Sequence, residues 1–467
     1  MIEITPVLDS RSNSPLYVQL ANYIKQEILS GRIKPNEKLP SKRNLSRYLN
    51  LSLNTIQSAY EQLCAEGYVE SKPRKGIFVS TFNEEIPSNQ IFSQKCEPEN
   101  EELKVNIKYD FNSGKVDLEH FPYSIWRKLT IQSLYQDKGE LFYNGNPQGE
   151  LLLREQIAKY LFASRGVRCS ANQIIIGAGT QVLIGLLSLL IGKDHIYALE
   201  NPGLHRTRTT LQDLGVHTIS TPLDEDGINI NQLKNSAASV VYVTPSHQFP
   251  YGMIMPISRR MELLKWAEGK NGYIIEDDYD GEYRFKGKPI PSLQGLDTKG
   301  NVVYLGTFSK SLIPSIRISY MVLPSSLIKK YQESFTVYKQ TVSRLHQDTL
   351  YRFMNDGHWQ SHLNKMRTLY RKKHSTLMVS IQNYFGENAI VVGGNSGLHI
   401  VLEVKNSMKE DELISKALNV GVKVYPISIY YHCAKESLSP GVILGFGGLS
   451  ETEIDIGIRL LKEVWEL

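Results

Sequence analysis

Apolar residues spaced four apart predict the first helix of the chain. The spacing follows Ser14-Pro15 and ends at Gly31, and it runs through Leu16, Leu20, Ile24 and Ile28. This spacing places the apolar side chains on one helical face, and a polar cap followed by proline is typical of a helix start. We therefore predict an amphipathic helix over residues 16–30.

Shorter patterns follow up to residue 80. Ser41 is a candidate N-cap for a short second helix that turns Leu45 and Leu49 inward. Residues 50–56 read as a turn, and a third helix then continues to residue 66 with Ile56, Tyr60 and Leu63 on its apolar face. Residues 68–79 predict two short strands around a basic turn. Three helices and a hairpin in this order predict a winged helix-turn-helix over residues 1–80.

From about residue 109 the pattern changes to buried strands that run into polar loops. Continuous apolar runs occur at residues 174–176, 240–243, 273–275 and 302–305, and helical patterns lie between them. Strands that alternate with helices predict an α/β fold. Residues 81–108 show no sustained period and are acidic and interrupted by proline, so we expect a tether between two domains.

Composition and charge support this division. A chain of 467 residues exceeds what one core holds, so at least two domains are expected. Residues 1–80 contain 11 Lys and Arg against 7 Asp and Glu, and they carry +4 of the net charge of +5. A basic N-terminal module attached to a neutral one points to nucleic acid as a partner.

Two classes of protein are not indicated. The chain has no signal peptide and no apolar run that could span a membrane, so a cytoplasmic protein is expected. Its four cysteines are scattered without metal-ligand spacing, so we expect neither disulfides nor a metal site.

The loop at residues 306–317 carries the clearest chemistry. It follows a buried strand and contains Thr307, Ser309, Lys310 and, seven residues after the lysine, Arg317. Hydroxyls and a guanidinium bind a phosphate monoester, and a lysine among them can form a Schiff base with an aldehyde. Together they indicate a pyridoxal 5′-phosphate site; a surface loop that happens to hold one lysine and one arginine is the alternative.

A second strand end supports the cofactor site. Asp277 and Tyr279 follow a buried strand, and Asp277 lies 33 residues before Lys310. Ligands of α/β sheets bind beyond the carboxyl ends of the strands, where a carboxylate can pair with a pyridinium nitrogen. The alternative is a solvated acidic turn.

These motifs resemble the fold-type I aminotransferases, whose SxSK…R signature matches residues 307–317. The resemblance implies that Lys310 holds the cofactor as an aldimine, Asp277 pairs with the pyridinium and Tyr279 bonds the phenolic oxygen. It also implies a phosphate cup that includes Gly179, Thr180 and Gln181 at a helix start. In that fold the residue at the place of Tyr143 reaches the phosphate of a partner subunit, which implies a homodimer.

Residues 39–79 resemble the GntR class of bacterial DNA-binding domains, with the pattern LPSxRxLAxxLxVSRxTVxxAYxxLxxEG nearly unbroken. The third helix of such a domain enters the major groove of double-stranded DNA. The resemblance implies contacts from Arg43, Ser52, Asn54, Thr55, Gln57, Arg74, Lys75 and Gly76. Leu53 replaces the usual arginine; leucine can contact a thymine methyl but cannot pair with guanine, so base preference should differ there.

The stretch TPSHQFPYG at residues 244–252 is similar to the MocR-type subfamily of GntR regulators, in which a winged helix is fused to an aminotransferase-like domain. His247 or Gln248 is expected at the cofactor ring, and a loop-packing role is the alternative. Two positions depart from working aminotransferases: Leu204 replaces a stacking aromatic residue and Ile443 an arginine that clamps carboxylates. Arg206 and Arg208 are candidates to bind an effector carboxylate.

The resemblance implies a transcription regulator that holds pyridoxal 5′-phosphate on Lys310 and senses an amine, an amino acid or the B6 vitamer itself. An aminotransferase with an accessory DNA-binding domain is the alternative, and Leu204 and Ile443 disfavour it. A third hypothesis, a DNA-binding protein whose large domain is only a dimerisation scaffold, would not require the intact lysine, aspartate and phosphate set.

Overall fold

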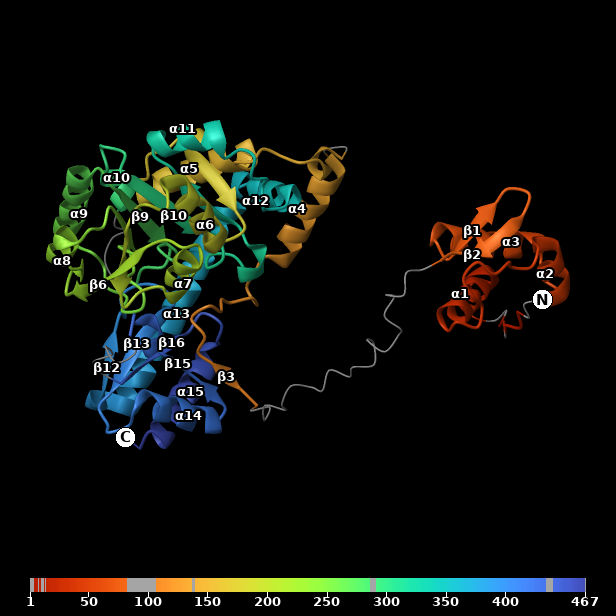
Figure 1. The fold of residues 1–467 in the computed structure, drawn as a ribbon. Helices are drawn as coiled ribbons and strands as arrows, with labels where there is room; N and C mark the ends of the chain where they lie inside the picture. Colours follow the sequence, from red (N-terminus) through yellow and green to blue (C-terminus); the bar gives the residue numbers. More distant parts are fainter. Residues whose placement is uncertain are drawn as a thin grey trace. The chain divides into compact units, whose positions relative to one another are not determined.

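The structure, a computed structural model, describes residues 4–6, 8–9, 12, 14–81, 106–136, 139–285, 291–433 and 440–466. It contains two compact units that meet in the sequence at about residue 105 (Figure 1). Most of the expected tether, residues 82–105, lies outside the described residues, and so does Cys96.

The N-terminal unit is a winged helix-turn-helix, as the sequence predicts. Its two strands pair antiparallel, with Val69 opposite Val79. Its apolar core includes Leu20, Ile24, Leu45, Ile56 and Leu63. The elements are α1 (Leu16–Leu29), α2 (Lys42–Leu49), α3 (Leu53–Ala65), β1 (Val69–Lys72) and β2 (Gly76–Val79).

Helix caps explain where these helices begin. The Ser41 hydroxyl accepts a hydrogen bond from the Asn44 N–H at 3.2 Å, as expected for an N-cap. Between α2 and α3, Asn50 has φ +52°, a left-handed conformation that asparagine tolerates. The first helix differs from the sequence prediction, because Pro15 occupies its cap position and Ser14 makes no side-chain cap.

The C-terminal unit is built on an eight-stranded sheet in the order β4-β11-β10-β9-β8-β5-β6-β7. The neighbouring pairs from β10 to β6 are parallel, and β4, β11 and β7 pair antiparallel. The strands are β4 (Ile174–Gly177), β5 (Tyr197–Asn201), β6 (Thr218–Asp224), β7 (Gly227–Ile228), β8 (Val240–Val243), β9 (Tyr273–Asp278), β10 (Val302–Thr307) and β11 (Ser319–Val322).

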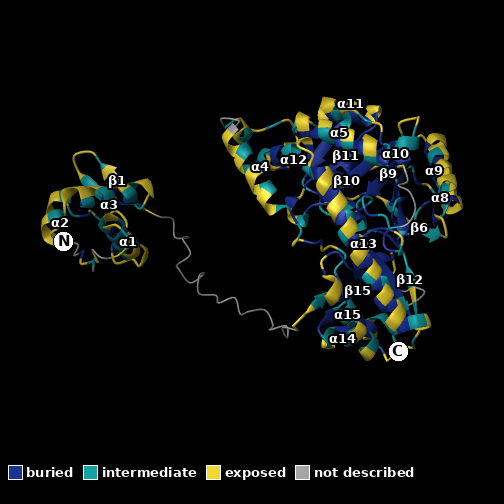
Figure 2. Ribbon diagram, turned by 180° about the vertical axis from the view of Figure 1, so that it is seen from behind, coloured by how far each residue is buried: buried dark blue, intermediate teal, exposed yellow. Residues whose placement is uncertain are grey.

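Helices surround this sheet and leave its central strands buried (Figure 2). Burial on both faces explains why these strands are continuous apolar runs rather than alternating ones. The helices are α4 (Tyr123–Gln136), α5 (Leu151–Arg165), α6 (Thr180–Ile191), α7 (His205–Asp213), α8 (Ile230–Asn235), α9 (Ile257–Lys270), α10 (Leu293–Leu296), α11 (Ser325–Ser334) and α12 (Arg344–Asn355).

The 28-residue helix α13 (His358–Phe385) runs from the large sheet to a smaller C-terminal subdomain (Figure 1). There a four-stranded sheet, β12-β13-β16-β15, lies against the last two helices. Its elements are β12 (Ala389–Val392), β13 (His399–Val404), β15 (Tyr425–Pro426), β16 (Gly441–Gly445), α14 (Glu410–Asn419) and α15 (Glu451–Val464), and β14 (Val422–Lys423) pairs with β3 (Tyr109–Asp110).

This architecture confirms the predicted combination of a winged helix-turn-helix and an α/β domain. The carboxyl ends of parallel strands β8, β9 and β10 lie at one edge of the sheet, where the polar loops of the sequence begin. Within the described ranges, we find no helix with the length and apolar character needed to cross a membrane.

Candidate cofactor site and DNA-binding surface

Lys310 lies in the loop after β10, and its ammonium group donates a hydrogen bond to the carbonyl oxygen of Ser113. Burial lowers the pKa of Lys310, the negative charge of Asp280 raises it, and the positive charge of Arg206 lowers it further. A lowered pKa increases the fraction of free amine, which is the form that attacks an aldehyde. The loop therefore presents an amine suited to Schiff-base chemistry.

Hydroxyl groups and an arginine gather beside this lysine. The Thr307 hydroxyl accepts hydrogen bonds from the Ser309 N–H at 3.2 Å and from the Ser319 hydroxyl at 2.8 Å, and it donates to the Ser309 hydroxyl at 3.1 Å. Arg317 is exposed and donates to the carbonyl oxygen of Ala178 at 3.5 Å.

The glycine turn before α6 closes the same cup. Gly179 has φ +98°, and a Cβ atom added there would overlap the Arg317 guanidinium. Thr180 and Gln181 begin α6, so their backbone N–H groups belong to a helix N-terminus, which favours anions. The structure thus brings five predicted phosphate residues, Gly179, Thr180, Thr307, Ser309 and Arg317, to one place with Gln181 next to them.

Asp277, the next-to-last residue of β9, is a buried carboxylate with one oxygen available. Its Oδ2 accepts a hydrogen bond from the Tyr242 hydroxyl, and its Oδ1 has no hydrogen-bond partner among the described residues. Burial raises the pKa of Asp277 to about 7, while the bond from Tyr242 lowers it. A protonated ring nitrogen would satisfy Oδ1, and its positive charge would favour the ionised carboxylate.

Two observations, one at Asp277 and one at Gly179, test whether a pyridoxal phosphate fits the site. The unpartnered Oδ1 of Asp277 matches a pyridinium N–H, and the cup in which only glycine fits at position 179 matches a phosphate. Lys310 follows Thr307 and Ser309 in the loop after β10 and supplies the amine. The residues present therefore fit the cofactor.

Tyr279 and His247 contact each other at the same edge of the sheet. The Tyr279 hydroxyl lies 2.9 Å from Nδ1 of His247 and donates to the His247 carbonyl oxygen at 3.0 Å. Gln248 instead bonds the backbone of Pro202 and Phe249, so its side chain holds the loop. Tyr143 is exposed, and its place at a partner's phosphate remains a prediction.

The two candidate effector arginines differ in position. Arg206 on α7 is exposed and close enough to Lys310 for its charge to lower the lysine pKa. Arg208 is half-buried and donates to the carbonyl oxygen of Ile429 at 3.4 Å. Arg206 is therefore the arginine that could meet an anion bound near the lysine.

The two departures from aminotransferases lie in apolar surroundings. Leu204 packs against a cluster that includes Phe249 and Tyr430, and Ile443 is fully buried in β16, where it pairs with Val401. Neither side chain can bind a carboxylate. Phe249 and Tyr430 of this cluster were not predicted, because they come from two distant parts of the sequence.

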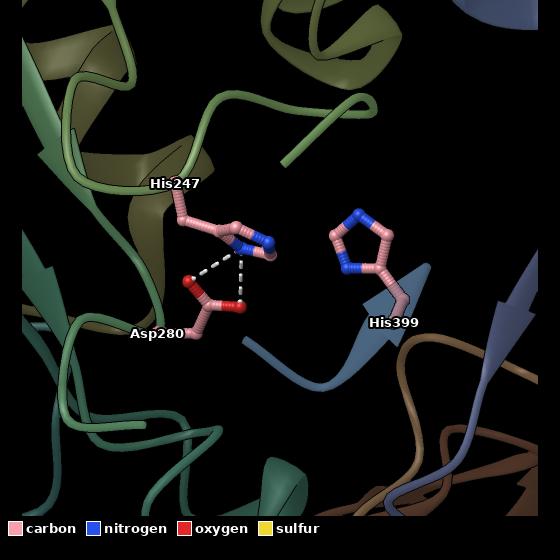
Figure 3. Close-up of side chains that lie close together, drawn as sticks. All are labelled: His247, Asp280 and His399. Carbon is pink, nitrogen blue, oxygen red and sulfur yellow. Dashed lines mark hydrogen bonds and ion pairs between the residues drawn. The ribbon is translucent and has the colours of Figure 1, made fainter. Parts of the chain in front are cut away.

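Sequence reasoning also missed Tyr242, Asp280 and His399. Tyr242 bonds Asp277, and the side chains of His247, Asp280 and His399 converge in the interior (Figure 3). Asp280 could have been found, since it lies one residue after Tyr279 in the acidic loop. His399 begins a strand 152 residues after His247, and no local pattern indicates that they meet.

In the N-terminal unit, most predicted DNA contacts are exposed. They are Arg43, Ser52, Asn54, Gln57, Arg74 and Lys75. Ser52 caps α3, since its hydroxyl accepts from the Thr55 N–H at 3.1 Å and contacts the Thr55 hydroxyl at 2.8 Å. Gln57 donates to Glu61 at 2.8 Å.

The wing turn has a defined shape. Arg74 and Gly76 have φ +63° and +117°, and a Cβ at Gly76 would lie 2.8 Å from the Lys38 side chain. Gly76 thus shapes the turn that presents Arg74 and Lys75.

Replacing either Arg43 or Lys75 by alanine is expected to weaken binding to double-stranded DNA and to reduce its dependence on salt. Each phosphate contact contributes about one unit to the slope of log K against log salt. Titration of the full-length protein with duplex DNA at several salt concentrations measures this slope.

Arg32→Ala is the matched control, because Arg32 is exposed but already paired with Glu27 at 2.5 Å. It should leave the slope unchanged. If the slope of log K against log salt decreased equally in all three variants, the decrease would not be specific to the predicted DNA-binding surface.

Comparison with known proteins agrees with both units. Residues 16–79 match the family "Bacterial regulatory proteins, gntR family", and residues 106–441 match "Aminotransferase class I and II". The chain is 46% identical over 469 residues to the HTH-type transcriptional regulator YdeL of Bacillus subtilis, described as uncharacterized, with full coverage of both chains. It is 30% identical to the probable rhizopine catabolism regulatory protein MocR of Rhizobium meliloti, covering 98% of this chain and 95% of that one.

Among solved structures, the kynurenine aminotransferase of Pyrococcus horikoshii is similar, with a TM-score of 0.68 and 24% identity. The match covers 77% of this chain and 91% of that chain. At this identity the likeness establishes the fold of the C-terminal unit.

Proposed function

Since the chain belongs to the MocR-type GntR transcription regulators, we propose that it binds operator DNA through residues 1–80 and holds pyridoxal 5′-phosphate on Lys310 to sense a small ligand. The GntR domain implies DNA binding, and the aminotransferase class I and II fold implies dependence on this cofactor. Residues 81–108 would be the tether and residues 109–467 the sensing and dimerisation domain.

One observation carries the proposal: among the described residues, the buried Oδ1 of Asp277 has no partner, in a site that also holds Lys310 and a glycine-lined cup. A DNA-binding protein that used this domain only as a scaffold would not need a buried carboxylate oxygen without a partner, which costs free energy. This arrangement therefore supports a cofactor-dependent sensor over a scaffold.

Different residues of the site would bind different groups of the cofactor. When bound, the cofactor supplies an aldehyde that captures amines and a ring that withdraws electrons. Lys310 would provide the covalent attachment, Asp277 would accept the ring N–H, and Tyr279 would donate to the phenolic oxygen. The Arg317 cup holds the phosphate.

A small amine, an amino acid or the vitamer itself would be the effector. Arg206 supports a ligand with a carboxylate, because its charge lies near the amine of Lys310. Such a ligand changes DNA binding only if it favours one arrangement of the two units over the other.

We further propose a homodimer in the cytoplasm. Exposed aromatic residues are found on α4 and in the segment after it, namely Tyr123, Tyr135, Phe142 and Tyr143. Clustered exposed apolar groups favour an interface. A twofold pair of winged helices would also match a DNA site made of two half-sites.

The alternative function is an aminotransferase with an accessory DNA-binding domain. Leu204 cannot stack on a ring as an aromatic residue does, and the buried Ile443 cannot orient a substrate carboxylate. Imperfect orientation lowers the rate of proton transfer. Both residues therefore support a sensor with poor turnover.

Purified full-length protein should show a visible absorption band, and borohydride should fix the cofactor to Lys310.

Steady-state assays over a panel of amino donors should give turnover below about 1 per second, under the ordinary enzyme range, while selection from random duplexes recovers a specific operator. Faster turnover on any donor together with no specific operator would reverse the proposal in favour of the enzyme.

A further inference from the structure

A buried polar cluster lies at the edge of the cofactor site. It consists of His247 in the loop after β8, Asp280 in the loop after β9, and His399 at the start of β13, each about 2% exposed (Figure 3). Buried polar side chains are usually paired, and each pairing fixes an orientation. The hydrogen bonds of this cluster therefore define where its protons lie.

Asp280 determines which nitrogen of His247 carries the proton. Nδ1 of His247 lies 3.0 and 3.1 Å from the two carboxylate oxygens of Asp280 (Figure 3). A carboxylate accepts hydrogen bonds, so Nδ1 is the donor. Nε2 of His247 is buried and has no hydrogen-bond partner among the described residues.

The Tyr279 hydroxyl also contacts the Nδ1–H group of His247. Its hydroxyl oxygen lies 2.9 Å from Nδ1 of His247, and its proton is donated to the His247 carbonyl oxygen at 3.0 Å. A hydroxyl has a single proton, so it can serve one strong acceptor at a time. The Tyr279 oxygen therefore shares the Nδ1–H of His247 with the Asp280 carboxylate, while its own proton can be given to another acceptor.

The ring of His247 is held in this position by its neighbours. A Cβ added at Gly397 would overlap the ring, and one added at Gly252 would lie 2.9 Å from Nε2. The His399 ring lies 4.9 Å away, between centroids, and its Nε2 donates to the Pro250 carbonyl oxygen at 3.0 Å. Burial lowers the pKa of His399 to about 3, so this neighbour adds no charge.

We propose that the His247–Asp280 pair is a positioning unit that orients the Tyr279 hydroxyl and sets the strength of the hydrogen bond it donates to the bound cofactor. The inference rests on the proposed function. A hydroxyl that accepts an N–H bond becomes a stronger donor, because hydrogen bonds in a chain polarise one another. The phenolic oxygen of the cofactor would take the place of the His247 carbonyl as acceptor.

The sign of the effect follows from charge. A stronger donor stabilises negative charge on the phenolic oxygen, so the bound cofactor loses its titrating proton at lower pH. The charged groups that act on Tyr279 or Lys310 are Asp277 and Asp278 on β9, Asp280, Glu200 on β5 and Arg206 on α7. A cavity lined by His247 and Asp280 is also lined by Arg165, Glu282, Arg284, Arg367 and Arg371. They remain in place when only His247 is changed.

Two variants of His247 distinguish the loss of the Nδ1–H donor from the loss of the ring itself. His247→Asn places an amide N–H on the same carbon that bears Nδ1, whereas His247→Gln places its amide near Nε2. In full-length protein loaded with pyridoxal 5′-phosphate, His247→Gln should raise the pH midpoint of the visible band by about half to one unit, the scale of one net hydrogen bond. His247→Asn should restore the native midpoint, and both variants keep the charge of Asp280.

Equal shifts in the Gln and Asn variants, or no shift in any variant, would overturn the positioning role while leaving the proposed function intact. The ligand atoms of His247, Asp280 and His399 lie within 4.8 Å of one another. A stoichiometric divalent metal in the native protein, lost in both His247 variants, would therefore also overturn it in favour of a metal site. Failure of the native protein to bind pyridoxal 5′-phosphate would instead reject the proposed function.

Discussion

A Lys310→Ala protein should bind operator DNA as well as the native protein does but lose its response to the effector. The substituted side chain belongs to the C-terminal unit, so the exposed basic surface around Arg43 and Lys75 is untouched. The amine that attaches the cofactor is removed, and borohydride should no longer fix any cofactor to the chain.

The response should disappear because the ligand acts through its interaction with the attached cofactor. A ligand that interacts equally with two states of a protein shifts neither. Coupling between two sites is ordinarily about 5- to 150-fold in affinity, and it should fall to about one-fold in the variant. Titration of a selected operator duplex, with and without the amine or amino acid that affects the native protein, measures the change.

Lys330→Ala is a matched control. Lys330 on α11 also donates to a backbone carbonyl, that of Leu190, at 2.6 Å. Its loss removes a comparable hydrogen bond away from the cofactor site, so attachment and response should remain. A Lys310→Ala protein that still carried covalent cofactor, or still responded in full, would contradict the assignment of Lys310.

The sequence predicted the parts of the fold that depend on local pattern. The apolar runs of β8, β9 and β10 are buried on both faces, and a polar loop follows each, so both the strands and the edge that holds Asp277 and Lys310 could be inferred. The helices of the N-terminal unit followed from their apolar spacing and from Ser41 as a cap, but α3 begins at Leu53, inside the segment that the sequence predicted as a turn.

What the sequence could not predict depends on contacts between distant segments. Lys310 bonds the carbonyl of Ser113, which lies 197 residues earlier, and His399 reaches His247 from another strand. Neither pairing leaves a periodic signal in the chain. Ser52 illustrates a second limit, because a capping serine and a DNA-contacting serine have the same local sequence pattern.

The phosphate cup gives the second large prediction: Gly179→Ala should raise the Kd for pyridoxal 5′-phosphate by about 10- to 100-fold. The added Cβ would overlap the Arg317 guanidinium, which must move away from the cup. A hydrogen bond to a charged group is worth about 1.5 to 3 kcal/mol, which corresponds to this range of affinity. Fluorescence or absorbance titration of the cofactor measures the Kd.

Backbone strain must be separated from this effect, because Gly179 has φ +98° and alanine is strained there. Gly215→Ala provides the control: Gly215 has φ +73°, and apart from its chain neighbours no heavy atom of the described residues lies within 4 Å of its added Cβ. It should lower the free energy of unfolding by about 1 kcal/mol and leave the Kd for the cofactor unchanged.

The Arg317→Ala and Gly179→Ala/Arg317→Ala proteins complete the comparison. If Gly179→Ala acts by displacing the guanidinium, Arg317→Ala alone should weaken cofactor binding to a similar extent, and the double variant should lose little more, because both changes remove one interaction. Additive losses would show that the glycine and the arginine act separately. A native Kd in Gly179→Ala would show that the phosphate lies elsewhere.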